Sequence, residues 1–381
     1  MIYLDNAATS FPKPERVYIA MDEFLREKGG NPGRGSHSLA QAARRVIEET
    51  RWLLAQFLHV PEAERLVFTL NCTDSLNLAL KGLLRSGDHV IISSLEHNAV
   101  MRPLHKLEQQ GIKITRIPVS PAGITDEAEI EKAISPRTRL IVMVHGSNVN
   151  GVIQPVEKYG AIARKHDVLL LVDAAQSVGH LDLNVKECNI DLLAFSGHKG
   201  PFGPPGVGVL YIGPRVNLDT IREGGTGSFS ENETQPEKLP DRFESGTMNS
   251  VGICGLGAGL QFILDTGLAK IIAHERKLME SLIFGLNPVP GVTLYPAGTH
   301  VDQVPVLSFN ITGYEPGEVA AILDQAFDIK VRAGLHCAPA AHKTLGTFPR
   351  GTVRISPGFF NTEAEIEQVV RAISKIARSR N

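Results

Sequence analysis

The sequence predicts an α/β protein in which a mostly parallel sheet builds a large domain and a smaller α+β domain follows it. The chain has 381 residues, more than one compact core usually contains, so two domains are expected. Up to about residue 264, apolar runs alternate with amphipathic stretches, which is the pattern of repeated β-α units. After Pro288 the apolar runs shorten and two helices are interleaved with them, as in an α+β domain.

The strands of the large domain are predicted from short runs rich in apolar and β-branched residues. These runs are 66–69, 89–94, 113–117, 139–144 and 168–173, and a further buried run spans 191–195. Amphipathic stretches at 74–84, 98–110 and 155–166 predict helices. Strand–helix–strand connections join parallel strands, so helices should cover both faces of this sheet.

The smaller domain is predicted from strands at 304–310 and 352–356 and from helices at 316–327 and 363–378. A long apolar helix at 251–266 should connect the two domains. We therefore expect the large domain to span residues 13–264.

Composition excludes several classes of protein. The net charge of −2 predicts neither a nucleic-acid nor an anionic-membrane partner. The chain contains no apolar run of bilayer length and no recognisable signal peptide, so we expect a cytoplasmic protein. The four cysteines (72, 188, 254 and 337) are widely spaced, which favours neither a disulfide framework nor a metal site.

Polar residues follow two of the buried runs. Asp173 and Gln176 follow one, and Ser196, His198 and Lys199 follow the other. Because ligands bind at the carboxyl ends of parallel strands, these side chains should converge on one crevice. A lysine there can form a Schiff base with a carbonyl cofactor, and an aspartate can hold a protonated pyridine nitrogen. These are the two groups that pyridoxal 5'-phosphate (PLP) needs.

Two further residues carry chemical information. Arg354 lies among apolar residues, and a buried guanidinium needs a carboxylate, supplied either by a substrate or by a structural ion pair. Cys337 lies in a loop marked by glycine, histidine and proline, where Arg332 and His336 would favour a thiolate. The alternative for Cys337 is a small buried side chain without chemical function.

The ordered motifs resemble the class V aminotransferase group of PLP fold-type I enzymes, and most closely the group II, selenocysteine-lyase-like cysteine desulfurases. The motifs are Tyr3-Leu-Asp-Asn-Ala-Ala-Thr9, Asp173-Ala-Ala-Gln-Ser, Ser196-Gly-His-Lys and Arg354-Ile-Ser, so the resemblance covers nearly the whole chain. It implies a fold-type I large domain, and it places residues 1–12 with 265–381 in the small domain.

The resemblance also implies roles around the cofactor. Lys199 forms the Schiff base, Asp173 pairs with the pyridine nitrogen, Gln176 binds the phenolic oxygen, and His97 stacks on the ring and assists proton transfer. Without the surrounding motifs, His97 would be interpreted as a helix cap or a core histidine.

The phosphate would be bound by Cys72, Thr73, Ser196 and His198, with Thr247 contributed by the opposite subunit of a homodimer that shares its active sites. Cys72 stands where relatives usually have a threonine. For residues 71–75 the alternative is a plain helix cap made by Thr73 or Asp74.

For the substrate, the resemblance implies that Arg354, Asn148 and Arg332 bind the carboxylate. Cys337 would take sulfur from L-cysteine as a persulfide and leave L-alanine. L-Selenocysteine should also react, and turnover should be slow unless a sulfur-acceptor protein withdraws the sulfur. Relatives commonly have two histidines before the cysteine, whereas this chain has Leu335 and His336.

Alternatives remain within PLP chemistry and outside it. A selenocysteine lyase, C–S lyase, epimerase or aminotransferase would not depend on Cys337. A catalytically inactive sulfur carrier or scaffold is disfavoured, because it would not need Lys199, Asp173, His97 and Arg354 together. A nicotinamide-dependent oxidoreductase is disfavoured, because no Gly-x-Gly-x-x-Gly follows the first strand.

Overall fold

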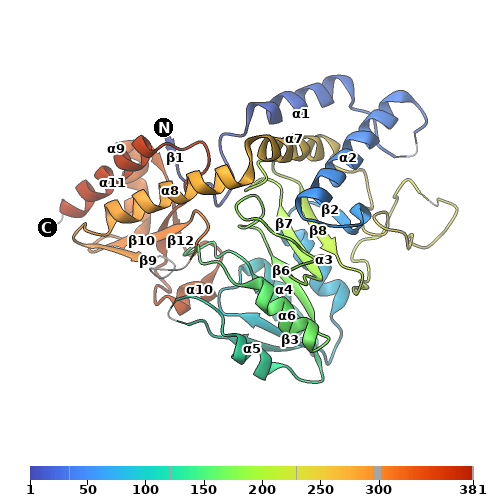
Figure 1. Cartoon of the computed structure of the whole chain (residues 1–381), viewed down its shortest axis with the longest axis horizontal. Helices are drawn as coiled ribbons and strands as arrows, with labels where there is room; N and C mark the ends of the chain where they lie inside the picture. The colour runs from blue at the N-terminus through green and yellow to red at the C-terminus, as the bar shows by residue number, and fades with distance from the viewer. Residues whose placement is uncertain (34, 121, 229, 296–301, 380–381) are drawn as a thin grey trace.

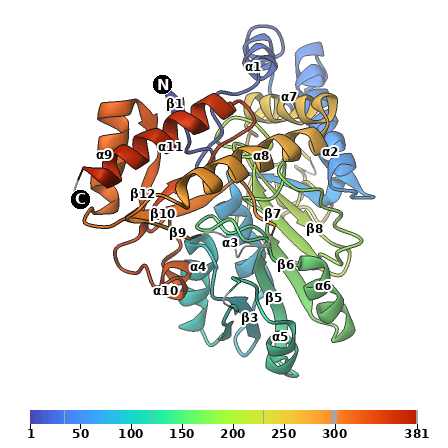
Figure 2. The same cartoon turned by 60° about the vertical axis from the view of Figure 1, so that its left-hand side comes forward.

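Two sheets of different character organise the molecule (Figures 1 and 2). The computed structural model describes residues 1–379 apart from 34, 121, 229 and 296–301. The segment 265–381 expected in the small domain therefore includes residues 296–301 and 380–381, which lie outside the described part of the chain.

The larger sheet has seven strands in the order β2-β8-β7-β6-β5-β3-β4. Its strands are β2 (Leu66–Thr69), β3 (His89–Ser93), β4 (Lys113–Ile117), β5 (Thr138–Val144), β6 (Leu169–Asp173), β7 (Leu192–Ser196) and β8 (Gly208–Ile212). All neighbours pair in parallel except β8, which is antiparallel to both β2 and β7. The prediction of a mostly parallel sheet is confirmed, whereas β8 is not among the predicted strands.

Alternate residues of the strands pack against helices on opposite faces of this sheet. On β6, Leu170 and Val172 join a core with α2 (Ser38–Phe57), α6 (Val156–Lys165) and α7 (Ser250–Thr266). Leu169 and Leu171 join a core with α3 (Cys72–Leu83) and α4 (Asn98–Glu108) on the other face. Helices therefore cover both faces, as predicted, and every β6 side chain is buried.

The smaller sheet is antiparallel, with the order β12-β13-β10-β9. Its strands are β9 (Val292–Tyr295), β10 (Leu307–Ile311), β12 (Arg332–Gly334) and β13 (Thr352–Ile355). The N-terminal strand β1 (Ile2–Tyr3) pairs with β11 (Ile329–Lys330). Ile2 and Leu4 share a core with the smaller sheet, so the first residues of the chain pack with its last part.

The remaining helices are α1 (Glu15–Glu27), α5 (Glu127–Ala133), α8 (Leu268–Leu286), α9 (Pro316–Phe327), α10 (Pro339–Thr344) and α11 (Glu363–Arg378). Helix α8 follows α7 after a bend of 84° and runs from the larger sheet to the smaller one (Figure 1). Within the described residues no single helix is long and apolar enough to cross a membrane. Helices α7 and α8 taken together are long and apolar enough by length and composition, but the chain bends sharply between them.

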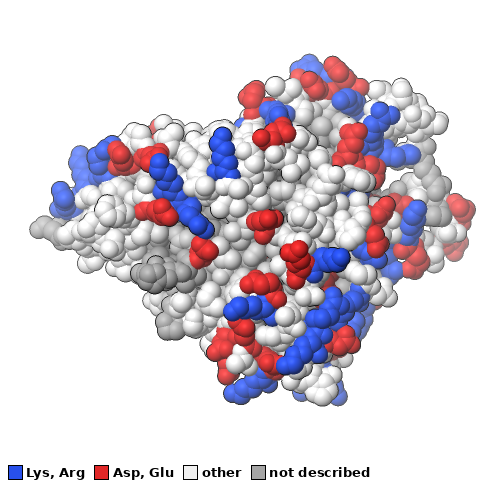
Figure 3. Space-filling model, in the orientation of Figure 1, with Lys and Arg blue, Asp and Glu red and all other residues white. Residues whose placement is uncertain are grey.

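The surface charges are mixed in sign. On the face shown in Figure 3, lysine and arginine side chains are interspersed with aspartate and glutamate. Among the described residues, many charged side chains form exposed ion pairs, such as Arg26 with Asp22 and Lys158 with Glu127. Exposed pairs of this kind contribute little to stability, so the buried sheet core dominates the stability of the fold.

Leu171 tests this packing. Its side chain is fully buried in the middle of β6, and we expect Leu171→Ala to lower the free energy of unfolding by about 2–5 kcal/mol. Leu25→Ala, at a side chain that is 63% exposed, is the matched control and should change it by less than about 0.5 kcal/mol. Urea denaturation measures both, and equal effects would contradict this assignment of the core.

Candidate active site

One cavity of about 260 Å³ lies at the carboxyl ends of β5, β6 and β7. Asp173, Gln176, Ser196, His198 and Lys199 line it from the ends of β6 and β7. Cys72, Thr73 and His97 line it from the starts of α3 and α4, and Asn148 lines it from the loop after β5. Nine predicted site residues therefore meet at one cavity.

The lysine in this cavity is chemically unusual. Desolvation lowers the pKa of Lys199, and the nearby Arg354 and Arg332 lower it further, although the Asp173 carboxylate opposes the shift. The lowered pKa favours the neutral amine, which is the form that condenses with an aldehyde or accepts a proton.

Asp173 is held at the end of β6 by local hydrogen bonds. Its Oδ1 accepts from the Ala175 backbone N–H at 3.0 Å and from the Cys72 thiol at 3.5 Å. Burial raises the pKa of Cys72 well above its ordinary value, and the Asp173 charge adds to the effect. Cys72 is therefore a neutral thiol donor to the carboxylate.

Backbone donors at a helix start face the same cavity. Asn71 caps α3, because its side chain accepts from the Asp74 N–H at 3.0 Å. The alternative of a cap by Thr73 or Asp74 is therefore wrong. The Cys72 N–H donates to Ser196 Oγ at 2.9 Å. A capped helix N-terminus beside hydroxyl groups is a common phosphate site.

His198 supports the same assignment. Its Nδ1 is buried and has no hydrogen-bond partner among the described residues. Burial lowers the pKa of His198 to about 4, and Lys199 and Lys13 contribute to that shift. The His198 imidazole, the α3 N-terminus, Ser196, the Asp173 carboxylate and the Lys199 amine together fit PLP.

His97 both caps a helix and lines the cavity. Its Nδ1 accepts from the Ala99 N–H at 3.0 Å at the start of α4. The capping bond fixes the ring orientation at the rim. Burial lowers the pKa of His97, while the Asp173 charge opposes that shift.

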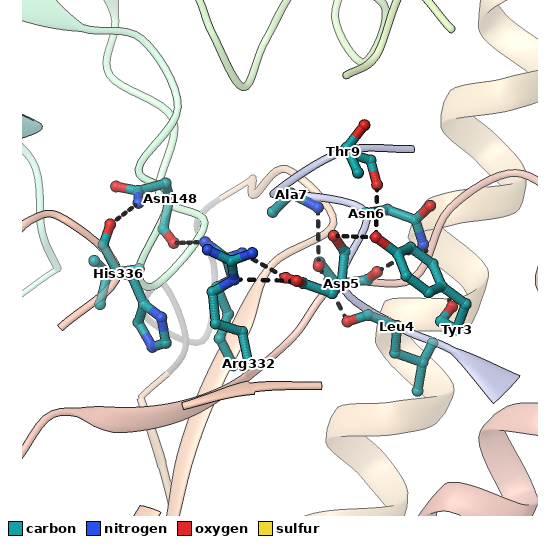
Figure 4. Close-up of polar contacts among 12 residues, drawn as sticks. Tyr3, Leu4, Asp5, Asn6, Ala7, Thr9, Asn148, Arg332 and His336 are labelled. Atoms are coloured by element: carbon teal, nitrogen blue, oxygen red, sulfur yellow. Dashed lines mark hydrogen bonds and ion pairs between the residues drawn. The ribbon is translucent and has the colours of Figure 1, made fainter. Parts of the chain in front are cut away.

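Arg354 pairs with a carboxylate of this chain. Its Nη2 lies 2.8 Å from Asp5 Oδ1, and its Nη1 donates to the Asn148 carbonyl at 3.1 Å. Arg332 Nε binds the other Asp5 oxygen at 3.0 Å (Figure 4). The Asn148 side chain donates to the His336 carbonyl at 2.7 Å, which ties the cavity wall to the cysteine loop (Figure 4).

Cys337 is exposed at the tip of a tight turn and does not line the cavity. The Ala338 N–H donates to the Leu335 carbonyl at 2.8 Å, and both His336 and Cys337 have positive φ. This is the pattern of a type I′ turn, unusual for residues other than glycine, aspartate and asparagine. The Cys337 carbonyl accepts from the Asn98 N–H at 2.8 Å, so the turn is anchored next to His97.

The expected influence of His336 on this cysteine needs correction. The imidazole is buried and shares a hydrogen bond with Thr352 Oγ1 at 3.1 Å. Burial lowers its pKa to about 2, and Arg354 adds to the shift. His336 is therefore neutral at physiological pH, and its ring cannot supply the positive charge predicted to favour a thiolate.

Thr247 lies apart from the other predicted residues. It is exposed and lines a second cavity of about 770 Å³, together with the buried Arg51–Glu244 ion pair. It does not line the cavity of Lys199.

The family model for "Aminotransferase class-V" matches residues 2–369. The chain belongs to the class-V aminotransferase family.

Similar class-V proteins include named cysteine desulfurases. A "Probable cysteine desulfurase" of Methanothermobacter thermautotrophicus is 37% identical over 99% of this chain and 94% of its own length. A "Cysteine desulfurase" of Salmonella agona is 34% identical over 99% and 94%.

Solved structures of cysteine desulfurases have the same fold as this chain. The apo cysteine desulfurase of Thermococcus onnurineus has a TM-score of 0.90 at 37% identity, covering 99% of this chain and 95% of that one. The Escherichia coli cysteine desulfurase CsdA has a TM-score of 0.88 at 29% identity, covering 98% and 94%.

The N-terminal segment of this class-V protein contributes residues that the sequence analysis did not assign to the site. The His198 carbonyl accepts from Thr9 Oγ1, from the backbone N–H and hydroxyl of Ser10, and from Lys13 Nζ, at 2.8 to 3.3 Å. Burial lowers the pKa of Lys13 to about 7. Asp5 and Thr9 lie within the motif of residues 3–9, and this motif was the only sequence feature that pointed to them. The sequence around them does not predict which residues they contact.

A buried histidine beside the site predicts pH-dependent stability. The His145 N–H donates to the Asp173 carbonyl at 2.9 Å, and burial lowers the pKa of the His145 side chain to about 4. The unfolded chain binds a proton here at about pH 6.5, so this group favours folding above that pH and the contribution is lost as pH falls toward 4. We expect His145→Gln to reduce the loss of unfolding free energy between pH 7 and 4 by roughly 3 kcal/mol.

Urea denaturation at several pH values between 7 and 4 measures this slope. The matched control is His105→Gln, at an exposed histidine, which should leave the slope unchanged. A His145→Gln slope equal to that of the wild type would contradict the assignment.

Proposed function

We propose that this protein is a PLP-dependent cysteine desulfurase of the group II branch, converting L-cysteine to L-alanine. The observation that carries the proposal is the meeting of Lys199, Asp173, His198 and His97 at one cavity, with the Cys337 turn anchored beside His97. The named activity of relatives that match nearly the whole chain supports the same reaction.

The cofactor would be held by residues already placed around the cavity. Lys199 would carry it, Asp173 would pair with its ring nitrogen, and Gln176 would bind its phenolic oxygen. Cys72, Thr73, Ser196 and His198 would bind its phosphate at the start of α3. When bound, PLP supplies an aldehyde for the substrate amine and a ring that withdraws electrons from the α-carbon.

The residues of the chain then act on L-cysteine in turn. Arg354, with Asn148 and Arg332, would bind the substrate carboxylate. Neutral Lys199 would remove the α-proton, and His97 would assist proton transfer at the rim of the cavity.

Cys337 would complete the reaction. Its thiolate attacks the substrate sulfur, so that an S–S bond forms while the Cβ–S bond breaks, and Cβ gains a proton. L-Cysteine and the Cys337 thiol thus give L-alanine and a Cys337 persulfide without an external oxidant. L-Selenocysteine is an alternative substrate, and a sulfur-acceptor protein would remove the persulfide.

The active unit in this proposal is a homodimer with shared sites. Thr247, which is exposed and does not line the cavity of its own chain, would reach the phosphate of the partner subunit.

The decisive test uses single-turnover formation of L-alanine and protein persulfide from L-cysteine. We expect Cys337→Ala to lower the rate of alanine formation by roughly 10³-fold or more and to abolish the persulfide, because the attacking thiol is lost. Cys188→Ala, at a half-buried cysteine that does not line the cavity, is the matched control and should retain both products.

Equal alanine formation without Cys337 would refute the desulfurase proposal. It would favour a selenocysteine lyase, a C–S lyase or another class-V activity that does not use this thiol.

A further inference from the structure

The turn that carries Cys337 has a backbone conformation that needs support. His336 and Cys337 have φ values of +47° and +57°, which residues with a side chain adopt only at a cost in free energy. Contacts to the main chain support the turn from two sides. The Asn98 N–H donates to the Cys337 carbonyl, and the Asn148 side chain donates to the His336 carbonyl (Figure 4). The His336 side chain provides a third and more deeply buried support.

A chain of hydrogen bonds leads from the His336 ring through the smaller sheet. His336 Nε2 lies 3.1 Å from Thr352 Oγ1 on β13, and Thr352 Oγ1 donates to Ser308 Oγ on β10 at 2.9 Å. Ser308 Oγ in turn donates to the Val149 carbonyl at 2.6 Å. Thr352, Ser308 and Val149 are completely buried. The chain therefore ends in the loop after β5, directly beside Asn148, which lines the cavity.

The direction of these bonds fixes the tautomer of His336. A carbonyl oxygen can only accept, so the Ser308 hydroxyl donates to Val149 and accepts from Thr352. Since the single proton of the Thr352 hydroxyl is then in use, Thr352 can only accept from His336 Nε2–H. Burial lowers the pKa of His336, so the ring is neutral and Nδ1 carries no proton. This Nδ1 has no hydrogen-bond partner among the described residues.

The orientation of the ring and the position of the thiol are linked through the backbone. The His336 ring packs against the fully buried His342, with ring centroids 5.4 Å apart, and donates to Thr352. Without the Thr352 oxygen, the buried Nε2–H would lose its partner, and the ring would gain free energy by turning toward water. Because His336 precedes Cys337 in the same tight turn, such a rotation would displace the thiol.

We propose that Thr352 is a positioning residue for Cys337, which holds His336 as the Nε2–H tautomer and so keeps the thiol in place for attack on the substrate sulfur. The inference rests on the proposed function, because it concerns the thiol that takes the sulfur of L-cysteine. Thr352 does not line the cavity. Its loss should therefore slow sulfur transfer and leave removal of the α-proton by Lys199 unchanged.

The test compares two reactions of the purified holoenzyme in Thr352→Val, which removes the hydroxyl and nearly keeps the shape of the side chain. Single-turnover formation of persulfide from L-cysteine needs Cys337. Exchange of the α-hydrogen of L-alanine with deuterated water needs Lys199 and not the thiol. We expect persulfide formation to slow by roughly 10- to 100-fold, because the attacking atom is misplaced, and α-hydrogen exchange to change by less than about twofold.

A conservative variant and a matched control separate this role from general damage to the protein. Thr352→Ser keeps the hydroxyl and should form persulfide within about threefold of the wild-type rate. Thr50→Val removes the hydroxyl of another buried threonine, which lies on α2 and donates to the Ile253 carbonyl. This control should leave both reactions unchanged.

Amide hydrogen exchange, measured by mass spectrometry, reports on the turn in the absence of substrate. The Ala338 N–H is hydrogen-bonded within the turn, and the Asn98 N–H is bonded to it. Peptides that contain these amides should exchange at least about fivefold faster in Thr352→Val than in the wild type or in Thr352→Ser. Thr50→Val should match the wild type in the same peptides.

Several results would overturn the inference. Wild-type persulfide formation in Thr352→Val is one, and an equal slowing of both reactions is another. Thr352→Ser that is as slow as Thr352→Val is a third, because the hydroxyl would then be irrelevant. Should Thr352→Val not fold, His336→Leu removes the donor at the other end of the bond. Slow persulfide formation with normal α-hydrogen exchange in His336→Leu supports the inference, and wild-type persulfide formation overturns it.

Failure of the proposed function would give a different result. Wild-type protein that exchanges the α-hydrogen of L-alanine but forms no persulfide would refute the desulfurase proposal. Faster amide exchange of the turn in Thr352→Val would then still support its anchoring by Thr352. Persulfide formation by the wild type together with a fully active Thr352→Val would refute the positioning role alone.

Discussion

The chain between Tyr3 and Lys13 is the physical link on which the geometry of the site depends. At one end, Asp5 binds Arg354 and Arg332 of the four-stranded sheet. At the other end, Ser10 and Lys13 donate to the carbonyl of His198, directly before Lys199 at the end of the seven-stranded sheet. One short segment therefore makes polar contacts with both sheets, at the two arginines and directly before Lys199.

Burial has opposite consequences for the charged groups of this site, depending on whether a carboxylate is within reach. Arg354 is almost completely buried and binds Asp5, which compensates for desolvation of the guanidinium. His198 and Lys13 are desolvated and have no paired carboxylate among the described residues, and their pKa values fall to about 4 and about 7. The site therefore combines a guanidinium paired with a carboxylate and nitrogen groups whose pKa values are lowered by burial.

The Cys337 turn differs from the rest of the site in its exposure and its backbone geometry. Two successive residues, His336 and Cys337, adopt left-handed conformations, which cost free energy for residues with a side chain. The hydrogen bond from Asn98 and the contact of Asn148 with His336 hold the turn against the cavity wall. These contacts fix the position of an exposed thiol next to the residues that line the cavity at His97 and Asn148.

The sequence alone determined the α/β class, most of the strands and the polar strand ends that carry Asp173 and Lys199. These features follow from the local sequence pattern, because a strand buried on both faces needs a short run of apolar residues. The antiparallel strand β8 and the neutral state of His336 were not predictable in this way, since they depend on pairing and burial. Only the tertiary structure decided that Asp5 lies between Arg332 and Arg354. Residues so far apart in the chain meet through strand pairing and domain packing, and no local pattern encodes that contact.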